Sequence, residues 1–147
     1  MIATTFRTDL FAGKVALVSG GTSGMGAAIG DALAACGATV TVTGATAAEA
    51  DAARAQTGFR WREAIVLDVR DSAAIAAFVG ALPRLDILVN CAGTIRRGAE
   101  HDPAIFAEVL DINLTGTMRL CAAARPLLAR TGGCIVNTAS MLEFFGG

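Results

Sequence analysis

The sequence of 147 residues has no block of like charges and no long apolar run, and each absence excludes a class of protein. Its formal net charge is −1, so nothing favours binding to nucleic acid or to an anionic membrane surface. No apolar run approaches the roughly 18 residues of a membrane span, and residues 1–10 lack the charged start and apolar core of a signal peptide. We therefore expect a cytoplasmic protein with no nucleic-acid partner and no membrane partner.

The cysteines are few and widely spaced, at Cys36, Cys91, Cys121 and Cys134. No two of them form a Cys-x-x-Cys pair, which argues against a metal site and against a redox motif. We expect no bound metal, and we expect these residues to be buried reduced thiols.

Hydrophobic residues make up 54% of the sequence, with a mean hydropathy of +0.57, and the Val, Ile and Leu residues gather in short runs. Such runs suit a sheet buried on both faces, although a domain that lacks part of its core partner would also have high hydropathy. Strands are expected at 14–19, 39–43, 64–67, 85–90 and 134–138. Helices are expected at 24–36, 46–57, 72–82 and 102–130, with Thr46, Ser72 and Asp102 as caps of the last three. This alternation predicts a single α/β domain over 1–147, with a doubly wound, Rossmann-like parallel sheet.

A glycine-rich loop joins the first strand to the first helix, with the sequence Ser19-Gly-Gly-Thr-Ser-Gly-Met-Gly26. A dinucleotide pyrophosphate needs a backbone without Cβ atoms and free N–H groups at a helix N-terminus. The backbone without Cβ atoms is provided by Gly20, Gly24 and Gly26, and further hydroxyl donors are provided by Thr22 and Ser23. A tight turn that packs a helix on a strand is the structural alternative. No Gly-Lys-Ser/Thr follows, so a nucleoside triphosphate loop is not expected.

Polar residues also close the later strands, where ligands of such sheets bind. Asp68 follows the third strand, Asn90 ends the fourth and Ser140 follows the fifth. Each has a duller interpretation, since Asp, Asn and Ser commonly satisfy backbone groups at turns. Asn113 is expected on a buried helical face with Phe106, Leu110, Thr117 and Leu120, with a local kink near Gly116. Buried there, its amide requires hydrogen-bond partners.

These motifs, in this order, resemble the short-chain dehydrogenase/reductase family. The resemblance rests on the glycine loop, Asp68-Val69, Asn90-Cys-Ala-Gly93, Asn113 within Asp111-Ile-Asn-Leu-Thr-Gly116, and Ile135-Val-Asn-Thr-Ala-Ser140. It implies hydride transfer between a nicotinamide and an alcohol or ketone carbon, with Ser140 as the donor to the reacting oxygen and Asn113 as a proton-relay residue. The cofactor-binding residues it implies are Gly20, Thr22, Ser23, Gly24, Met25, Gly26, Asp68, Val69, Asn90, Ala92 and Gly93.

The tyrosine and lysine that complete the family's catalytic set have no counterpart here. The sequence has no tyrosine, and its only lysine is Lys14. The resemblance places that pair beyond Gly147, so we expect a fragment of a longer enzyme whose sheet is incomplete at its C-terminal side. A non-catalytic dinucleotide-binding module remains the alternative. A methyltransferase on a similar sheet is disfavoured by the Asn90 and Ser140 motifs.

Cofactor choice is expected at the end of the second strand, where an acidic residue accepts the ribose hydroxyls of NAD. That place holds Gly44-Ala45-Thr46, with neither an acid for NAD nor an arginine for NADP. NAD or NADP is therefore expected, and the lack of positive charge favours NAD slightly.

The small-molecule substrate is expected to be an alcohol or carbonyl compound, with a sugar acid as one candidate. The stretches 92–97 and 139–147 resemble the deoxy-gluconate and keto-deoxy-gluconate dehydrogenases of the family, and Arg96 or Arg97 could bind a carboxylate through both of its oxygens. Two solvated loop arginines are the alternative. The resemblance also implies a homo-oligomer, a tetramer, for the complete protein.

Overall fold

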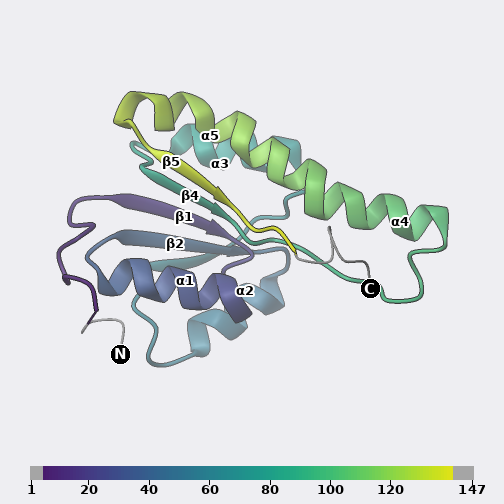
Figure 1. Ribbon diagram of the computed structural model, residues 1–147, viewed down its shortest axis with the longest axis horizontal. Helices are drawn as coiled ribbons and strands as arrows, with labels where there is room; N and C mark the ends of the chain where they lie inside the picture. The colour runs from purple at the N-terminus through teal and green to yellow at the C-terminus, as the bar shows by residue number, and fades with distance from the viewer. Residues whose placement is uncertain (1–4, 141–147) are drawn as a thin grey trace.

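The computed structural model describes residues 5–140 and has the predicted doubly wound α/β fold (Figure 1). Five parallel strands form one sheet in the order β3-β2-β1-β4-β5. The strands are β1 (Val15–Ser19), β2 (Thr39–Gly44), β3 (Glu63–Val66), β4 (Ile87–Asn90) and β5 (Cys134–Asn137). The strand order reverses between β1 and β4, so the carboxyl ends of these two strands flank the place where such sheets bind ligands.

Helices cover both faces of this sheet (Figure 1). The helices α1 (Gly24–Ala35) and α2 (Ala47–Ala55) pack on one face, where Val18, Val40 and Val42 are buried. The helices α3 (Ser72–Ala81) and α5 (Thr117–Thr131) pack on the other face, over Leu17 and Leu88. Because both faces of the central strands are covered, those strands read as continuous apolar runs in the sequence.

Most predicted boundaries agree with the structure to within one or two residues. The third helix differs in its cap, because the carboxylate of Asp71, not Ser72, accepts the N–H of Ala74 at 2.9 Å. β4 begins at Ile87, two residues later than predicted, and just before it the carboxylate of Asp86 accepts the N–H of Val15 at 2.9 Å.

The predicted long helix over 102–130 is three consecutive segments. It runs through α4 (Pro103–Leu110), a π-helical segment η2 (Asp111–Gly116) and α5, so the irregularity expected near Gly116 is present. A Cβ on Gly116 would lie 2.8 Å from Cβ of Val69, which means that glycine is needed where this segment passes the loop after β3.

The buried face predicted for this helix is wrong over its first half. Phe106 is 51% exposed and Leu110 is 40% exposed, and Asn113 is also exposed. The reason is that α4 extends past the end of the sheet (Figure 1). Leu120, one helical turn after Thr117, is 1% exposed and does face the core.

The cysteines are free thiols, but only Cys36 is buried as expected. Cys91 and Cys121 are half-buried and Cys134 is exposed, because β5 lies at an edge of the described sheet. Within residues 5–140, no three His, Cys, Asp or Glu side chains come together as a group that could hold a metal ion. None of the helices described is both long and apolar enough to span a membrane.

Candidate functional site

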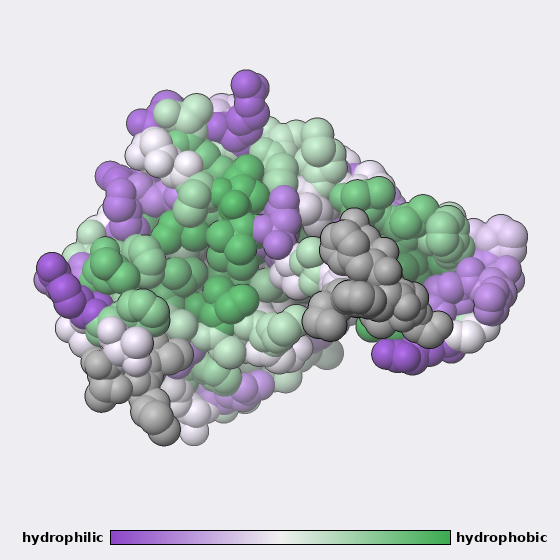
Figure 2. Space-filling model, in the orientation of Figure 1, coloured by the Kyte–Doolittle hydropathy of each residue, from purple (hydrophilic) through white to green (hydrophobic). Residues whose placement is uncertain are grey.

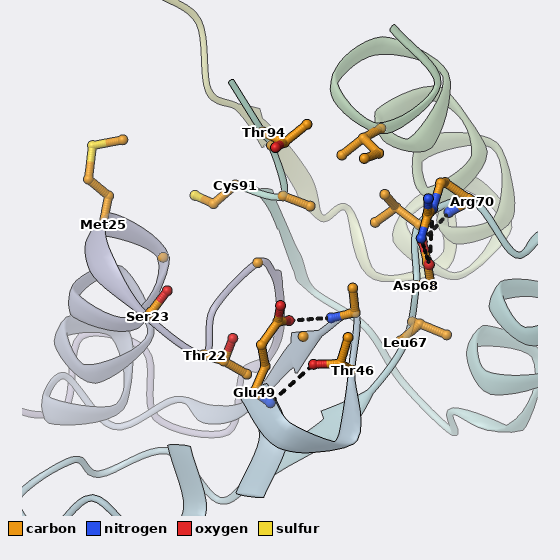
Figure 3. A pocket seen from close by; sticks show the side chains of 18 of the residues that line it. Thr22, Ser23, Met25, Thr46, Glu49, Leu67, Asp68, Arg70, Cys91 and Thr94 are labelled. Carbon is orange, nitrogen blue, oxygen red and sulfur yellow. Dashed lines mark hydrogen bonds and ion pairs between the residues drawn. The ribbon is translucent and has the colours of Figure 1, made fainter. Parts of the chain in front are cut away.

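A crevice of about 520 Å³ opens where the strands end (Figure 3). This volume lies within the usual range of small-molecule sites, roughly 300–1,000 Å³. Most of the predicted cofactor-binding residues line it, and the lining set among them is Gly20, Thr22, Ser23, Met25, Gly26, Asp68, Val69, Ala92 and Gly93. The crevice therefore brings together the segments that follow β1, β2, β3 and β4.

The glycine loop forms one wall of the crevice. Gly20 has φ of +64°, and a Cβ there would lie 2.6 Å from Cα of Ala92, so only glycine lets the loop meet the segment after β4. Gly26 packs its α-carbon against the carbonyl of Gly20, which closes the turn into α1. Both glycines thus have the tight-packing role that was the structural alternative for this motif.

Gly24 differs from the other two glycines. Its φ is +55°, yet a Cβ there would meet nothing within 4 Å. It begins α1, and the N-cap residue Ser23 makes no side-chain cap bond to the first turn. The N–H groups of this turn are therefore left for an anion beside an open surface, which fits the pyrophosphate of a dinucleotide.

The end of β2 carries an acidic group that the sequence pattern did not indicate. Glu49, in the first turn of α2, folds back so that its Oε2 accepts the N–H of Ala45 at 2.7 Å (Figure 3). The hydroxyl of Thr46 accepts the N–H of Glu49 at 3.2 Å, so Thr46 caps α2 as predicted. Residues 44–46 contain no acidic residue, as expected, but in the folded structure the carboxylate of Glu49 lies at the end of β2.

Charged groups join the opposite wall of the crevice. The guanidinium of Arg70 donates to both carboxylate oxygens of Asp68, from Nε to Oδ1 at 3.1 Å and from Nη2 to Oδ2 at 2.6 Å, and this lowers the pKa of Asp68. Glu108 of α4 lies 3.7 Å from Arg70 and 3.8 Å from Arg96. Neither Arg70 nor Glu108 belongs to a motif, and Glu108 lines the crevice from α4.

Asn90 lies behind the crevice and is 3% exposed. Its amide nitrogen donates to Oδ1 of Asn137 at 2.9 Å, and its Oδ1 accepts the hydroxyl of Ser19 at 3.5 Å. Asn90 therefore ties the ends of three strands together. Asn137 stands beside it in register on β5, and only the pairing of the strands reveals this.

Asn113 anchors the π-helical segment to the loop after β4. Its Oδ1 accepts the N–H of Thr94 at 2.8 Å and its Nδ2 donates to the carbonyl of Thr94 at 2.9 Å. The hydroxyl of Thr117 donates to the carbonyl of Asn113 at 3.1 Å. The amide has the partners that the sequence demanded, although it is exposed and not buried.

The two candidate carboxylate-binding arginines differ in position. Arg96 lines the crevice, donates to Oγ1 of Thr94 at 2.9 Å and has its main-chain N–H bound by Glu100. Arg97 is exposed and is not among the lining residues described. Ser140 comes two residues after Thr138. The N–H of Thr138 donates to the carbonyl of Asn90 at 3.1 Å, so the chain just before Ser140 lies beside the end of β4.

The sequence profile of the family described as short chain dehydrogenase matches residues 14–147. The chain belongs to the short-chain dehydrogenase family. The crevice described above lies at the reversal of strand order, which is where open α/β sheets generally bind ligands.

Relatives within the short-chain dehydrogenase family are similar over nearly the whole chain. D-threitol dehydrogenase of Mycolicibacterium smegmatis is 40% identical over 92% of this chain and 54% of its own length. 2-Dehydro-3-deoxy-D-gluconate 5-dehydrogenase of Pseudoalteromonas atlantica is 37% identical over 92% of this chain and 57% of its own length. The latter is of the sugar-acid type that the motifs resemble.

A solved structure described as a short chain dehydrogenase/reductase family protein has a TM-score of 0.82 and 35% identity, covering 94% of this chain and 60% of that one. The chain spans about half the length of the curated relatives it matches, as the 54% and 57% coverage show.

Proposed function

We propose that this chain is the cofactor-binding part of an NAD(P)-dependent oxidoreductase that acts on an alcohol or carbonyl carbon of a polyhydroxylated substrate. The observation that carries the proposal is Gly24, at a helix N-terminus whose N-cap residue Ser23 makes no side-chain cap bond, beside the crevice between β1 and β4. Relatives named as dehydrogenases of a sugar alcohol and of a sugar acid support the reaction class.

We propose the following roles for the chain's own residues. The α1 N-terminus and residues 20–26 bind the pyrophosphate, and the wall with Asp68 and Val69 holds the adenosine end. A bound nicotinamide supplies or accepts the hydride. Ser140 donates its hydroxyl hydrogen bond to the reacting oxygen, and Asn113 keeps the loop around Thr94 in place. The residue that exchanges the proton is proposed to follow residue 147.

A sugar-acid substrate would be bound by Arg96, not by Arg97. Arg96 lies in the crevice wall, 3.8 Å from Glu108, so a substrate carboxylate has to compete with that glutamate. Arg96→Ala is expected to raise KM for sugar acids about tenfold and to leave KM for neutral polyols unchanged, because a charge-assisted bond is lost for acids alone. Arg97→Ala is the matched control, and equal effects of both variants would contradict this assignment.

The direct test of the proposed function is turnover by the full-length protein. NAD and NADP are each offered with a panel of tetritols, hexitols and sugar acids, and reduction of the nicotinamide is followed by absorbance. Turnover with at least one polyol or sugar acid is expected. Tight dinucleotide binding without any turnover would favour the non-catalytic module, and binding of adenosylmethionine instead would overturn the proposal.

The complete protein is proposed to be a homo-oligomer, a tetramer. Exposed apolar side chains follow one another at four-residue spacing along α4, η2 and α5, and Figure 2 shows apolar surface at this end of the molecule. These side chains are Phe106, Leu110, Leu114 and Met118, of which Leu114 is 65% exposed. Leu114→Glu is expected to lower the mass measured by light scattering, because it places a charge in the apolar contact. The cytoplasmic location stays a prediction.

A further inference from the structure

The carboxylate of Glu49 stands in the crevice at the end of β2. Its Oε2 is held by the N–H of Ala45 at 2.7 Å, and a Cβ on Gly44 would lie 2.9 Å from this same oxygen. Gly44 is thus the residue that lets the carboxylate turn back toward the strand end. Figure 3 shows Glu49 between Thr22 of the glycine loop and the wall that carries Leu67 and Asp68.

This carboxylate has acceptor capacity to spare. A carboxylate offers about four acceptor positions, and Oε2 uses one of them for Ala45. Among residues 5–140, no side chain or main-chain donor binds Oε1, and no arginine or lysine forms an ion pair with Glu49. Within the described part of the chain, the charge of Glu49 is therefore not neutralised, and some of its acceptor positions remain unused.

The arginines of the crevice are already paired. Arg70 is bound to Asp68 at 2.6 Å, and both Arg70 and Arg96 lie near Glu108. The lining thus holds three carboxylates, from Glu49, Asp68 and Glu108, against two guanidinium groups. A further phosphate group would meet excess negative charge here.

We propose that Glu49 selects NAD over NADP by accepting hydrogen bonds from the ribose hydroxyls of the adenosine half. The inference rests on the proposed dinucleotide site. A vicinal diol offers two donors to one carboxylate, whereas a 2′-phosphate brings negative charge and acceptors to the same place. The acid is delivered from the first turn of α2 instead of from the strand end.

The test is direct binding of NADH and NADPH to the full-length protein, followed by nicotinamide fluorescence. The wild type is expected to bind NADH more tightly. Glu49→Gln keeps an oxygen for the N–H of Ala45 but removes the charge, so the ratio of the two Kd values is expected to shift about tenfold or more toward NADPH. Asp51→Asn is the matched control, because Asp51 lies on the same helix with its side chain 71% exposed.

A second variant separates charge from helix capping. Glu49→Asp is one methylene too short to reach the N–H of Ala45, but it keeps the negative charge. Because the charge is kept, this variant is expected to bind NADPH as weakly as the wild type does. The proposal is overturned if Glu49→Gln melts like the wild type with an unchanged Kd ratio, or if Glu49→Asp gains NADPH binding as Glu49→Gln does. A wild type that binds neither dinucleotide would instead contradict the proposed function.

Discussion

The side-chain amide of Asn90 donates to Oδ1 of Asn137 at 2.9 Å, which joins the carboxyl ends of β4 and β5 beneath the crevice. The two residues are partners in the strand register, and Ser19 and Thr43 continue the same row on β1 and β2. A row of polar side chains therefore crosses the sheet where its strands end. This polar row separates the apolar core of the sheet from the crevice at its carboxyl end.

Asn90→Ala is expected to lower the free energy of unfolding by about 1–3 kcal/mol, because it leaves the buried hydroxyl of Ser19 without its acceptor. Urea denaturation of the full-length protein measures the change. Asn137→Ala is the comparison, since it removes the acceptor of the Asn90 amide nitrogen but leaves the bond from Ser19 in place, so a smaller loss is expected. Equal losses in the two variants would show that the bond from Ser19 to Asn90 contributes little to stability.

Thr43 differs from the other residues of this row in its hydrogen bonding. It is 0% exposed, and its Oγ1 has no hydrogen-bond partner among the residues described. Thr43→Val, which has nearly the same shape, is expected to raise the free energy of unfolding by up to about 1 kcal/mol, because an unsatisfied buried hydroxyl is removed. Thr41→Val, at a half-buried position on the same strand face, is expected to change it less. A clear loss of stability in Thr43→Val would imply a partner for the hydroxyl.

Gly26→Ala is expected to destabilise the protein by about 2 kcal/mol and to weaken NADH binding. The added Cβ would collide with the carbonyl of Gly20, so the turn into α1 must open. Gly80→Ala is the matched control, because Gly80 lies in α3 with nothing within 4 Å of the added Cβ. It is expected to raise the melting temperature, since alanine stabilises a helix by about 1 kcal/mol over glycine. NADH binding that survives in Gly26→Ala would place the pyrophosphate elsewhere.

Asp86 couples stability to pH at the other end of the sheet. Its side chain is 2% exposed and accepts from Arg84 at 2.7 Å, and these hydrogen bonds lower its pKa far below the ordinary value. A carboxyl whose pKa is lowered on folding stabilises the native state above its unfolded pKa of about 3.9, and this stability is lost as the pH falls below that value.

Asp86→Asn is therefore expected to cost about 2 kcal/mol at neutral pH and to flatten the fall in stability below about pH 4. Urea denaturation at a series of pH values measures both effects. Asp9→Asn is the control, because Asp9 makes a similar pair with Arg7 but is exposed to solvent. An unchanged acid limb in Asp86→Asn would mean that other carboxyls control acid unfolding.

The strands and the glycine loop could be predicted because their signals are local. The β-branched run of β2 favours an extended strand, and the glycines around Thr22 permit the tight turn with positive φ that follows β1. The order of the motifs along the chain then placed Asp68 and Asn90 at the carboxyl ends of their strands. Neither prediction depends on the direction of a side chain.

Glu49 and Glu108 could not be predicted, because each reaches the crevice through geometry set at a distance. Glu49 has the spacing of a capping residue, and only the turn at Gly44 brings its carboxylate to the strand end. Glu108 depends on the direction of α4 beyond the sheet. The same extension of α4 explains why Phe106, predicted to be buried, is 51% exposed.

The central claim is that a nicotinamide dinucleotide binds with its pyrophosphate at the start of α1, between β1 and β4. Hydrogen exchange of the full-length protein, measured with and without saturating NADH, tests it most directly. The account predicts new protection in residues 20–26 and 90–94, with no change around Asp86 at the opposite end of the sheet. Protection confined to other segments, or none at saturating NADH, would contradict it.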